Sequence, residues 1–419
     1  MNNDVKNKQI AQTMKNTITR HSQMDCRTFE IKVVDNKLNR LQKESINGIF
    51  REAKWLRNAY LNNKDDVSSK VKIVPVKVGD TYEQRELIYL GSQIKQSVIK
   101  QVKSEIKGLS THKKKGDKIG KLKFKSYCNS INLKQYGTTY SINFDNDRIK
   151  VQNIKKSLYV RGLKQIPNDC EITNAKFVRK ASGLYFYITC FMPKEEKIKT
   201  NKQIGIDFGI EHNLTLSNGE KFDIKIKESD YIKRKSRKIN RLWAKEHKHS
   251  NNNKKRIQQL KIAYQKQTNK KKDKANKINN HILNSFDFIA MQDEMISNWH
   301  KGLFGKQVQN SAMGLIKAGL KNSSKTYVVD KSFPSTQICP KCGCLTKHTL
   351  EKREYHCEHC GYFHPSRDIK SAQSILDEAL KQVSMEHRTQ SLGEIEPSTS
   401  LDSSNIGKVC VMTQEAQVL

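Results

Sequence analysis

The chain has 419 residues, of which 78 are Lys or Arg and 42 are Asp or Glu, so its formal net charge is +36. This length suggests two to four domains. So large a positive net charge causes repulsion within the isolated chain and favours a polyanion as the binding partner. Nucleic acid is the leading candidate. The sequence has no run of about 18 apolar residues and no signal-peptide core. We therefore expect no membrane partner and a cytoplasmic, nucleoid-associated protein.

The first 200 residues predict helices followed by a β-rich region. Residues 29–34 have the pattern of a strand, and apolar residues then recur at helical spacing over 38–60 and 87–106. Residues 121–125 alternate lysine with apolar side chains, which predicts a strand with one cationic face. Three further β-rich runs, at 140–144, 158–161 and 185–189, indicate a small barrel or sheet that ends near residue 200.

From residue 201 the pattern changes to short apolar strands that alternate with helices. Residues 231–280 are helix-like and hold 18 Lys and Arg against two acids, which favours contact with nucleic acid. The other expected elements are strands at 203–210, 213–216, 286–291 and 326–330, and helices over 307–321 and from 368 onward. The last 35 residues have the composition of a disordered tail.

Two CxxC pairs form the strongest local signal. They are Cys339 with Cys342 and Cys357 with Cys360, and a glycine directly follows each pair. Four thiolates match the tetrahedral S4 geometry of zinc, and a closed set of four ligands is typical of a structural site. Three nearby side chains are interpreted as bystanders: Cys344, His356 and His359. The remaining cysteines do not form the pattern of a disulfide framework, which fits a reducing compartment.

Three acids lie at positions that suit catalysis. Asp207 is within one apolar strand, Glu294 follows another, and Asp368 begins a helix. An RNase H-like fold brings carboxylates in such positions together around a pair of divalent cations. Carboxylate ligands suit Mg²⁺, and two such ions activate a water and stabilise the leaving oxygen of a phosphodiester. Any one of these acids alone is more often solvated or salt-bridged.

Several motifs resemble the TnpB family of transposon-encoded RNA-guided DNA endonucleases, relatives of the compact type V CRISPR effectors. Ile204-Gly-Ile-Asp-Phe-Gly209 resembles the first RuvC motif. Phe333-Pro-Ser-Thr-Gln-Ile-Cys-Pro-Lys-Cys-Gly343 resembles the start of the zinc ribbon, and Cys360-Gly-Tyr-Phe-His-Pro-Ser-Arg-Asp-Ile-Lys-Ser-Ala372 resembles the run with the third RuvC acid. Weaker similarity extends over nearly everything before the tail.

The chain departs from the family at the second acidic motif. Many members have Glu-Asp-Leu there, whereas this chain has Gln292-Asp293-Glu294. Residues two apart share a strand face, so we select Glu294 as the ligand, although a kink at the strand end would favour Asp293. Near the third acid, Lys370 replaces the usual Asn and Ser371 an Ala.

The resemblance implies an α+β multidomain fold. In it, a β-barrel, wedge-like domain carries an inserted helical recognition lobe, and an RNase H-like α/β RuvC domain carries an inserted zinc ribbon. The expected parts are an N-terminal segment with the first wedge strand (1–36), the recognition lobe (37–110), the wedge domain (111–200), the RuvC-like domain (201–330) with a basic hairpin (231–280), the zinc ribbon (331–365), the RuvC C-terminal helix (366–384) and the tail (385–419).

The resemblance also implies the activity and partners. A guide RNA pairs with matching double-stranded DNA next to a short motif, and one RuvC-like site hydrolyses phosphodiesters with two Mg²⁺, while Zn²⁺ is structural. The metal residues are then Asp207, Glu294 and Asp368 for magnesium and the four cysteines for zinc. Two alternatives stay open: a guided DNA-binding protein or repressor without cleavage, and a transposase or structural zinc protein without a guide. A monomer and a homodimer are both compatible with the sequence.

Overall fold

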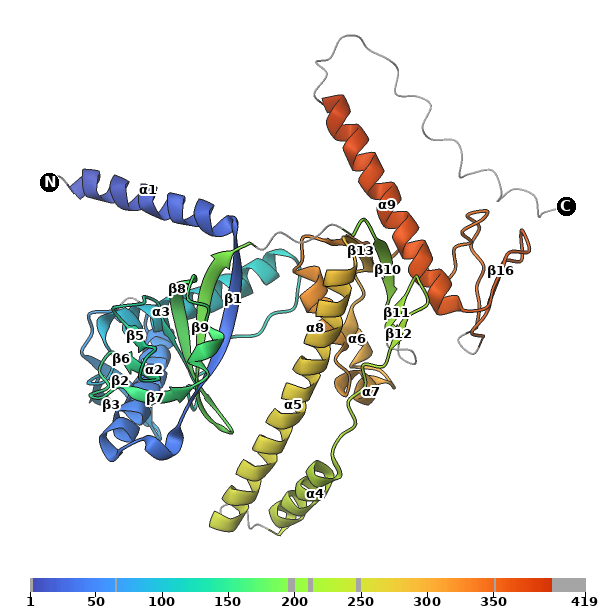
Figure 1. Cartoon of the computed structure of the whole chain (residues 1–419). Helices are drawn as coiled ribbons and strands as arrows, with labels where there is room; N and C mark the ends of the chain where they lie inside the picture. Colours follow the sequence, from blue (N-terminus) through green and yellow to red (C-terminus); the bar gives the residue numbers. More distant parts are fainter. Residues whose placement is uncertain are drawn as a thin grey trace. The chain divides into compact units, whose positions relative to one another are not determined.

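The computed structural model describes residues 3–64, 66–194, 200–209, 214–245, 250–349 and 352–393. The chain is mixed α+β and divides into two compact units (Figure 1). Unit 1 comprises Met1–Glu196 and Leu242–Gln265, and unit 2 comprises Lys197–Arg241 and Lys266–Leu419. No helix within the described ranges is both long and apolar enough to cross a bilayer.

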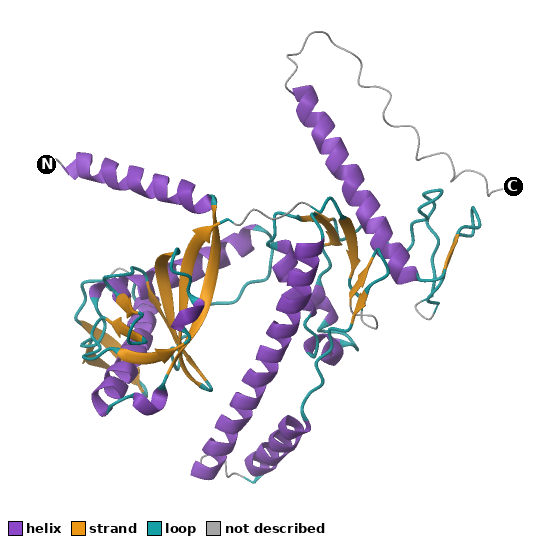
Figure 2. Ribbon diagram, in the orientation of Figure 1, coloured by secondary structure: helices purple, strands orange, loops and turns teal. Residues whose placement is uncertain are grey.

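Unit 1 is built around a curved, barrel-like antiparallel sheet of seven strands in the order β4-β8-β9-β1-β7-β6-β5 (Figure 2). Apolar residues of most of these strands fill a single core. The strands are β1 (Met24–Val33), β4 (Ser130–Leu133), β5 (Tyr140–Asn143), β6 (Arg148–Val151), β7 (Leu158–Arg161), β8 (Glu171–Lys180) and β9 (Gly183–Pro193). A separate hairpin pairs β2 (Ile73–Val78) with β3 (Thr81–Glu86).

Three long helices belong to unit 1: α1 (Asn3–Ser22), α2 (Arg40–Asn62) and α3 (Ser92–Lys114). A capping box between Asn39 and Gln42 starts α2, which then buries an apolar stripe against α3 and β2. Glu52 of α2 is a buried acid with a structural role, because its carboxylate accepts hydrogen bonds from the backbone N–H groups of Tyr89 and Leu90.

The strand predicted at residues 121–125 is wrong. These residues form an irregular segment along α2, where the carbonyl group of Lys125 accepts a hydrogen bond from Asn58 and its N–H donates to the same side chain. The backbone therefore bonds to a helix side chain rather than to a neighbouring strand. Alternation of lysine with apolar residues does not reveal whether a partner strand exists.

Unit 2 contains a five-stranded sheet in the order β12-β11-β10-β13-β14. β10, β13 and β14 run parallel, and β11 is antiparallel to β10. The strands are β10 (Gln203–Asp207), β11 (Leu214–Leu216), β12 (Lys221–Phe222), β13 (Phe288–Gln292) and β14 (Thr326–Val329). The helices whose bounds fall wholly or partly in this unit are α4 (Asp230–Ala244), α5 (Asn251–Ser285), α6 (Ile296–Trp299), α7 (Gly305–Gln309), α8 (Met313–Lys321) and α9 (Arg367–Gly393).

Helices cover both faces of the unit 2 sheet. Ile204, Ile206 and Met291 lie in one core with residues of the C-terminal half of α5 and of α8. Ala290 lies in a second core with residues of α9. Because side chains alternate along a strand, Gly205 and Asp207 are directed to the α9 side. A Cβ atom at Gly205 would overlap the carbonyl oxygen of Ala372, so glycine permits the close approach of β10 and α9.

Two predicted boundaries need correction. The helix expected over 307–321 is divided into α7 and α8, because the chain forms a bridge between Ser311 and Lys225 at the break. The final helix does not end at 384 but continues to Gly393. Residues 394–419 of the expected tail lie outside the described residues, as does Asn213 of the strand expected at 213–216.

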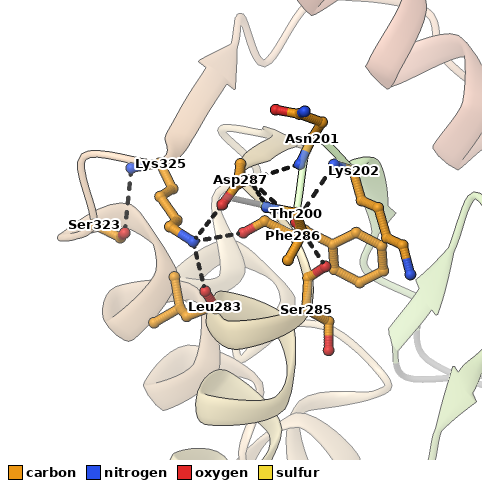
Figure 3. A network of polar contacts seen from close by, with 9 residues as sticks. All are labelled: Thr200, Asn201, Lys202, Leu283, Ser285, Phe286, Asp287, Ser323 and Lys325. Carbon is orange, nitrogen blue, oxygen red and sulfur yellow. Dashed lines mark hydrogen bonds and ion pairs between the residues drawn. The ribbon is translucent and has the colours of Figure 1, made fainter. Parts of the chain in front are cut away.

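Asp287 and Lys325 fasten the starting ends of the three parallel strands (Figure 3). Lys325 Nζ donates to Asp287 Oδ1 and to the carbonyl oxygens of Leu283 and Phe286, each at 2.9 Å. The other carboxylate oxygen accepts from the backbone N–H of Thr200 and, at 2.8 Å, from that of Asn201. The Lys325 hydrogen bond is the main reason that the pKa of Asp287 falls to about 2. We call this network the strand-start clasp.

Candidate active site and cysteine cluster

Asp207 ends β10 and is buried beneath the first turns of α9. Burial, and after it the negative charge of Asp368, raises the pKa of the Asp207 carboxyl to about 7. The hydroxyl group of Ser371 acts in the opposite direction and lowers this pKa. Burial is therefore the larger cause, and the neighbouring negative charge adds to it.

Glu294 and Asp293 have opposite environments although they are adjacent. Burial, followed by the charge of Asp207, raises the pKa of Glu294 to about 8, and its Oε2 atom is buried without a hydrogen-bond partner. Asp293 is about half exposed, and its Oδ1 lies 3.1 Å from Nζ of both Lys317 and Lys321, which lower its pKa. Glu294 is thus the residue of this pair that interacts electrostatically with Asp207.

Asp368 lies in the first turn of α9, where the helix dipole favours a carboxylate. Its charge acts on Asp207, and the charge of Asp207 acts on Glu294, so the three acids form one electrostatic cluster. Among the described residues, the three carboxylates do not supply a set of oxygens that all lie within 4.8 Å of one another. Mg²⁺ does not require such a cage, because it retains waters and binds through one or two carboxylates and substrate phosphates. The unpaired Glu294 oxygen and the two raised pKa values fit a divalent cation.

The four predicted cysteines converge. Their Sγ atoms all lie within 4.8 Å of one another, with Cys339 3.6 Å from Cys360 and Cys342 3.6 Å from Cys357. A tetrahedron with Zn–S bonds of about 2.3 Å has S···S edges of about 3.8 Å, so this spacing fits zinc. It is far longer than the roughly 2.05 Å of a disulfide bond. The cluster is compatible with a zinc ribbon.

Both halves of the cluster have the same backbone turn. The N–H of Gly343 donates to the carbonyl of Cys339 at 2.9 Å, and the N–H of Gly361 donates to that of Cys357 at 3.0 Å. Each glycine has a positive φ, 74° and 68° respectively, in the region that glycine occupies without strain. A glycine after each pair therefore has the conformational role that the sequence indicated.

A second possible ligand group overlaps the first. Cys342, Cys344 and His359 also place one ligand atom each within 4.8 Å of one another. This group has three members and shares Cys342 with the complete set of four, and His359 is exposed. His356 is exposed as well and belongs to neither group. The tetracysteine set remains the better match to a structural zinc site.

Sequence reasoning missed Ser335, which is 5% exposed and lies between the acidic cluster and the cysteine cluster. Its Oγ is 3.0 Å from Gln292 Oε1 and 3.1 Å from Ser371 Oγ, and its carbonyl oxygen accepts from Lys370 Nζ at 3.1 Å. Gln292, Lys370 and Ser371 were noticed only as departures from a family pattern. A serine in a loop carries no local signal of burial, because the burial comes from three distant segments.

Unit 1 contains a cavity of about 500 Å³ between α2, the β2–β3 hairpin and residues 124–126. Aromatic and cationic side chains line it, among them Trp55, Tyr82, Phe124, Lys54, Lys77 and Lys125. Aromatic faces stack on nucleic-acid bases and lysines contact phosphates, so this lining suits a nucleic acid. The lysine-rich helices α4 and α5 provide a further cationic surface.

These features define the class: a mixed α+β protein with a barrel-like sheet, a zinc-ribbon-type cysteine cluster and a group of buried and partly buried acids. Residues 187–298 match the OrfB_IS605 family model, described as "Probable transposase", and residues 316–375 match that of the Cas12f1-like TNB domain. A curated protein of Streptomyces pristinaespiralis named "Putative RNA-guided DNA endonuclease" is 25% identical over 247 residues. The aligned region spans 57% of this chain and 61% of that relative. These matches show that parts of the chain are similar to proteins of these descriptions.

Proposed function

We propose that the protein is an RNA-guided DNA endonuclease. In this proposal a guide RNA selects matching double-stranded DNA beside a short motif, and one acidic site hydrolyses phosphodiesters of the DNA. The observation that carries the proposal is the coupling of Asp207, Glu294 and Asp368 at the carboxyl edge of β10 and β13. The strand order with β10 central, antiparallel to β11 and parallel to β13, supports an RNase H-like, RuvC-type domain.

Each part of the site has a role in this proposal. Asp207, Glu294 and Asp368 hold two Mg²⁺ ions, which when bound supply an activated water and stabilise the leaving oxygen. Burial keeps bulk water from Asp207, and Lys317 holds Asp293 away from the cluster. The cysteine cluster holds Zn²⁺ and folds the segment between Glu294 and Asp368, which helps to load the substrate strand. The barrel-like sheet and helices of unit 1 bind the guide and target duplexes.

Cleavage of a matched plasmid by the protein purified with its RNA tests this proposal. We expect cleavage that depends on Mg²⁺ and on the match, and we expect Asp207→Ala and Asp368→Ala to reduce it by about a thousandfold or more while RNA binding persists. Glu294→Gln should have a comparable effect. Asp293→Asn is the matched control, because Asp293 is paired with two lysines, and it should retain cleavage.

The possible outcomes separate the alternatives. If no discrete RNA accompanies the purified protein, both guided functions are wrong. Loss of activity in Asp293→Asn but not in Glu294→Gln would mean that Asp293, and not Glu294, is the metal ligand. A second candidate function is a guided DNA-binding protein without cleavage, and the presence of Gln292 at the second motif favours it. Tight binding of the matched duplex without any nicking in Mg²⁺ would establish that candidate instead.

A further inference from the structure

We propose that Gln292 is a positioning residue that holds the start of α9, and with it Asp368, through Ser335, and that its side-chain amide is required for this role. The inference rests on the proposed function, because it concerns the same acidic cluster. It assigns a role to the position at which the chain departs from Glu-Asp-Leu. In this assignment Gln292 is a structural replacement that the surrounding loop recognises, rather than a metal ligand that has been lost.

The amide nitrogen of Gln292 donates hydrogen bonds to backbone carbonyl groups of a turn. Gln292 is 7% exposed, and its Nε2 lies 2.6 Å from the carbonyl oxygen of Phe333, 3.1 Å from that of Lys331 and 3.2 Å from that of Asp330. Three carbonyl oxygens therefore converge on one donor group. A carbonyl oxygen only accepts hydrogen bonds, so this pocket requires a donor at position 292.

The amide oxygen of Gln292 begins a relay that ends at the start of α9, which carries Asp368. Ser335 Oγ donates to Gln292 Oε1 at 3.0 Å, and Ser371 Oγ donates to Ser335 Oγ at 3.1 Å. Ser371 is fully buried, and its single hydroxyl proton is the one donated to Ser335. The relay joins β13, the loop after β14 and α9; Glu294 directly follows β13 and Asp368 lies in α9.

Lys370 fixes the relay from the side of the cysteine cluster. Its Nζ donates to the carbonyl oxygen of Ser335 at 3.1 Å and lies 3.9 Å from the centre of the Tyr355 ring. Tyr355 belongs to the small core that contains Cys339 and Cys357. Ser335 is thus held by Gln292 and by Ser371 and Lys370 of α9, so a change at Gln292 reaches Asp368 without a direct contact.

A carboxylate does not fit the position of Gln292. In a Gln292→Glu variant, one carboxylate oxygen would face three carbonyl oxygens at the distances that Nε2 now occupies, and no N–H would be left to satisfy them. Buried acceptors without donors are destabilising, and a buried charge without a partner is more so. The loop at 330–335 would move away from β13, and Ser335 would move with it.

Binding of Mn²⁺ to the purified protein–RNA complex, measured by calorimetry, tests the inference without reference to cleavage. Outer-shell hydrogen bonds typically contribute 10- to 100-fold to metal affinity, so we expect Gln292→Leu and Ser335→Ala each to weaken Mn²⁺ binding by about tenfold. Gln292→Glu should bind Mn²⁺ no more tightly than the wild type. Asp293→Asn, which lies outside the relay, should leave the Mn²⁺ affinity unchanged.

Two results would overturn the inference. One is tighter Mn²⁺ binding or faster cleavage by Gln292→Glu, which would identify position 292 as a ligand position. The other is an unchanged Mn²⁺ affinity in Ser335→Ala, the smallest of these substitutions and the deciding one if Gln292→Leu does not fold. Absence of cleavage by the wild type would count against the proposed function alone, because the Mn²⁺ measurement still reports on the relay.

Discussion

At the residue scale, burial and mutual repulsion disfavour ionisation of carboxyl groups in the acidic cluster. Asp207 is buried and Glu294 is partly buried, and each is subject to the negative charge of another acid. Asp293, one residue from Glu294, is instead stabilised in its charged form by two lysines. The same side-chain chemistry therefore has opposite consequences at adjacent positions, depending on burial and neighbours.

These pKa values predict that stabilisation by Mg²⁺ increases with pH. Without a divalent cation, native Asp207 and Glu294 retain protons up to about pH 7 and 8, whereas the unfolded chain releases them near pH 4. The native state thus binds more protons between these limits, so the free energy of unfolding falls as pH rises, by at most about 1.4 kcal/mol per pH unit for each group. Mg²⁺ favours the ionised carboxylates and should offset this loss.

The measurement is the thermal unfolding temperature at pH 5.5 and pH 8, each with and without Mg²⁺. We expect the rise caused by Mg²⁺ to be larger at pH 8, and we expect most of that difference to disappear in Asp207→Asn. Asp377→Asn changes an acid of α9 outside the cluster and serves as the control. An equal effect of Mg²⁺ at both pH values would contradict the assignment of the cation to these acids.

At the element scale, the packing of α9 on β10 determines how close the third acid comes to the first. Gly205 lets the carbonyl group of Ala372 approach the strand, and Leu376 lies beside the same position. The helix begins one residue before Asp368 and crosses the carboxyl end of β10. Any separation of these two elements would move Asp368 away from Asp207.

We predict that Gly205→Ala destabilises unit 2 by about 1–3 kcal/mol, the usual range for overpacking, and weakens Mn²⁺ binding. The added methyl group would overlap backbone atoms, which cannot rotate away as a flexible side chain can. Gly314→Ala is the control, because no atom lies within 4 Å of its added Cβ, and in α8 alanine should be neutral or slightly stabilising. Urea unfolding measures both variants. Equal stability of the two variants would show that α9 can shift to accommodate the added methyl group at little cost.

Elements were predicted best from the sequence where the pattern of apolar residues reflects burial. The apolar stripe of α2 and the apolar strands β10 and β13 were recognisable because continuous or periodic burial leaves a trace in local composition. The segment at 121–125 has the alternation of a strand, but its backbone partner is Asn58, which is distant in sequence. Likewise the cysteine spacing predicted the cluster, whereas the direction of the Gln292 side chain depends on a loop forty residues away and left no local signal.

At the scale of the whole molecule, two units with separate hydrophobic cores divide the chain. One core fills the barrel-like sheet of unit 1, and the cores of unit 2 flank its parallel strands. The cysteine cluster has its own small core around Tyr355 and belongs to unit 2. Loss of metal from the cluster should therefore affect unit 2 before it affects unit 1.

We predict that Cys339→Ser loses the bound zinc and unfolds the ribbon locally, while the unfolding transition of unit 1 is unchanged. Substrate loading should fail before the chemistry of the acidic cluster does. Elemental analysis measures the zinc content, and calorimetry of the full chain resolves the transitions. Cys344→Ser is the matched control and should retain zinc. The reverse pattern, with zinc lost only in Cys344→Ser, would assign the ion to Cys342, Cys344 and His359 instead.

The strand-start clasp also determines how unit 2 responds to a mechanical force. Asp287 binds the backbone of Thr200 and Asn201, the first described residues of unit 2 along the chain, and Lys325 ties Asp287 to the end of α5. Tension applied to the chain before Thr200 therefore acts on these bonds before it reaches β10. The carboxylates lie at the opposite end of the same strands, so a pull of this kind would break an ion pair and several hydrogen bonds before it displaced Asp207.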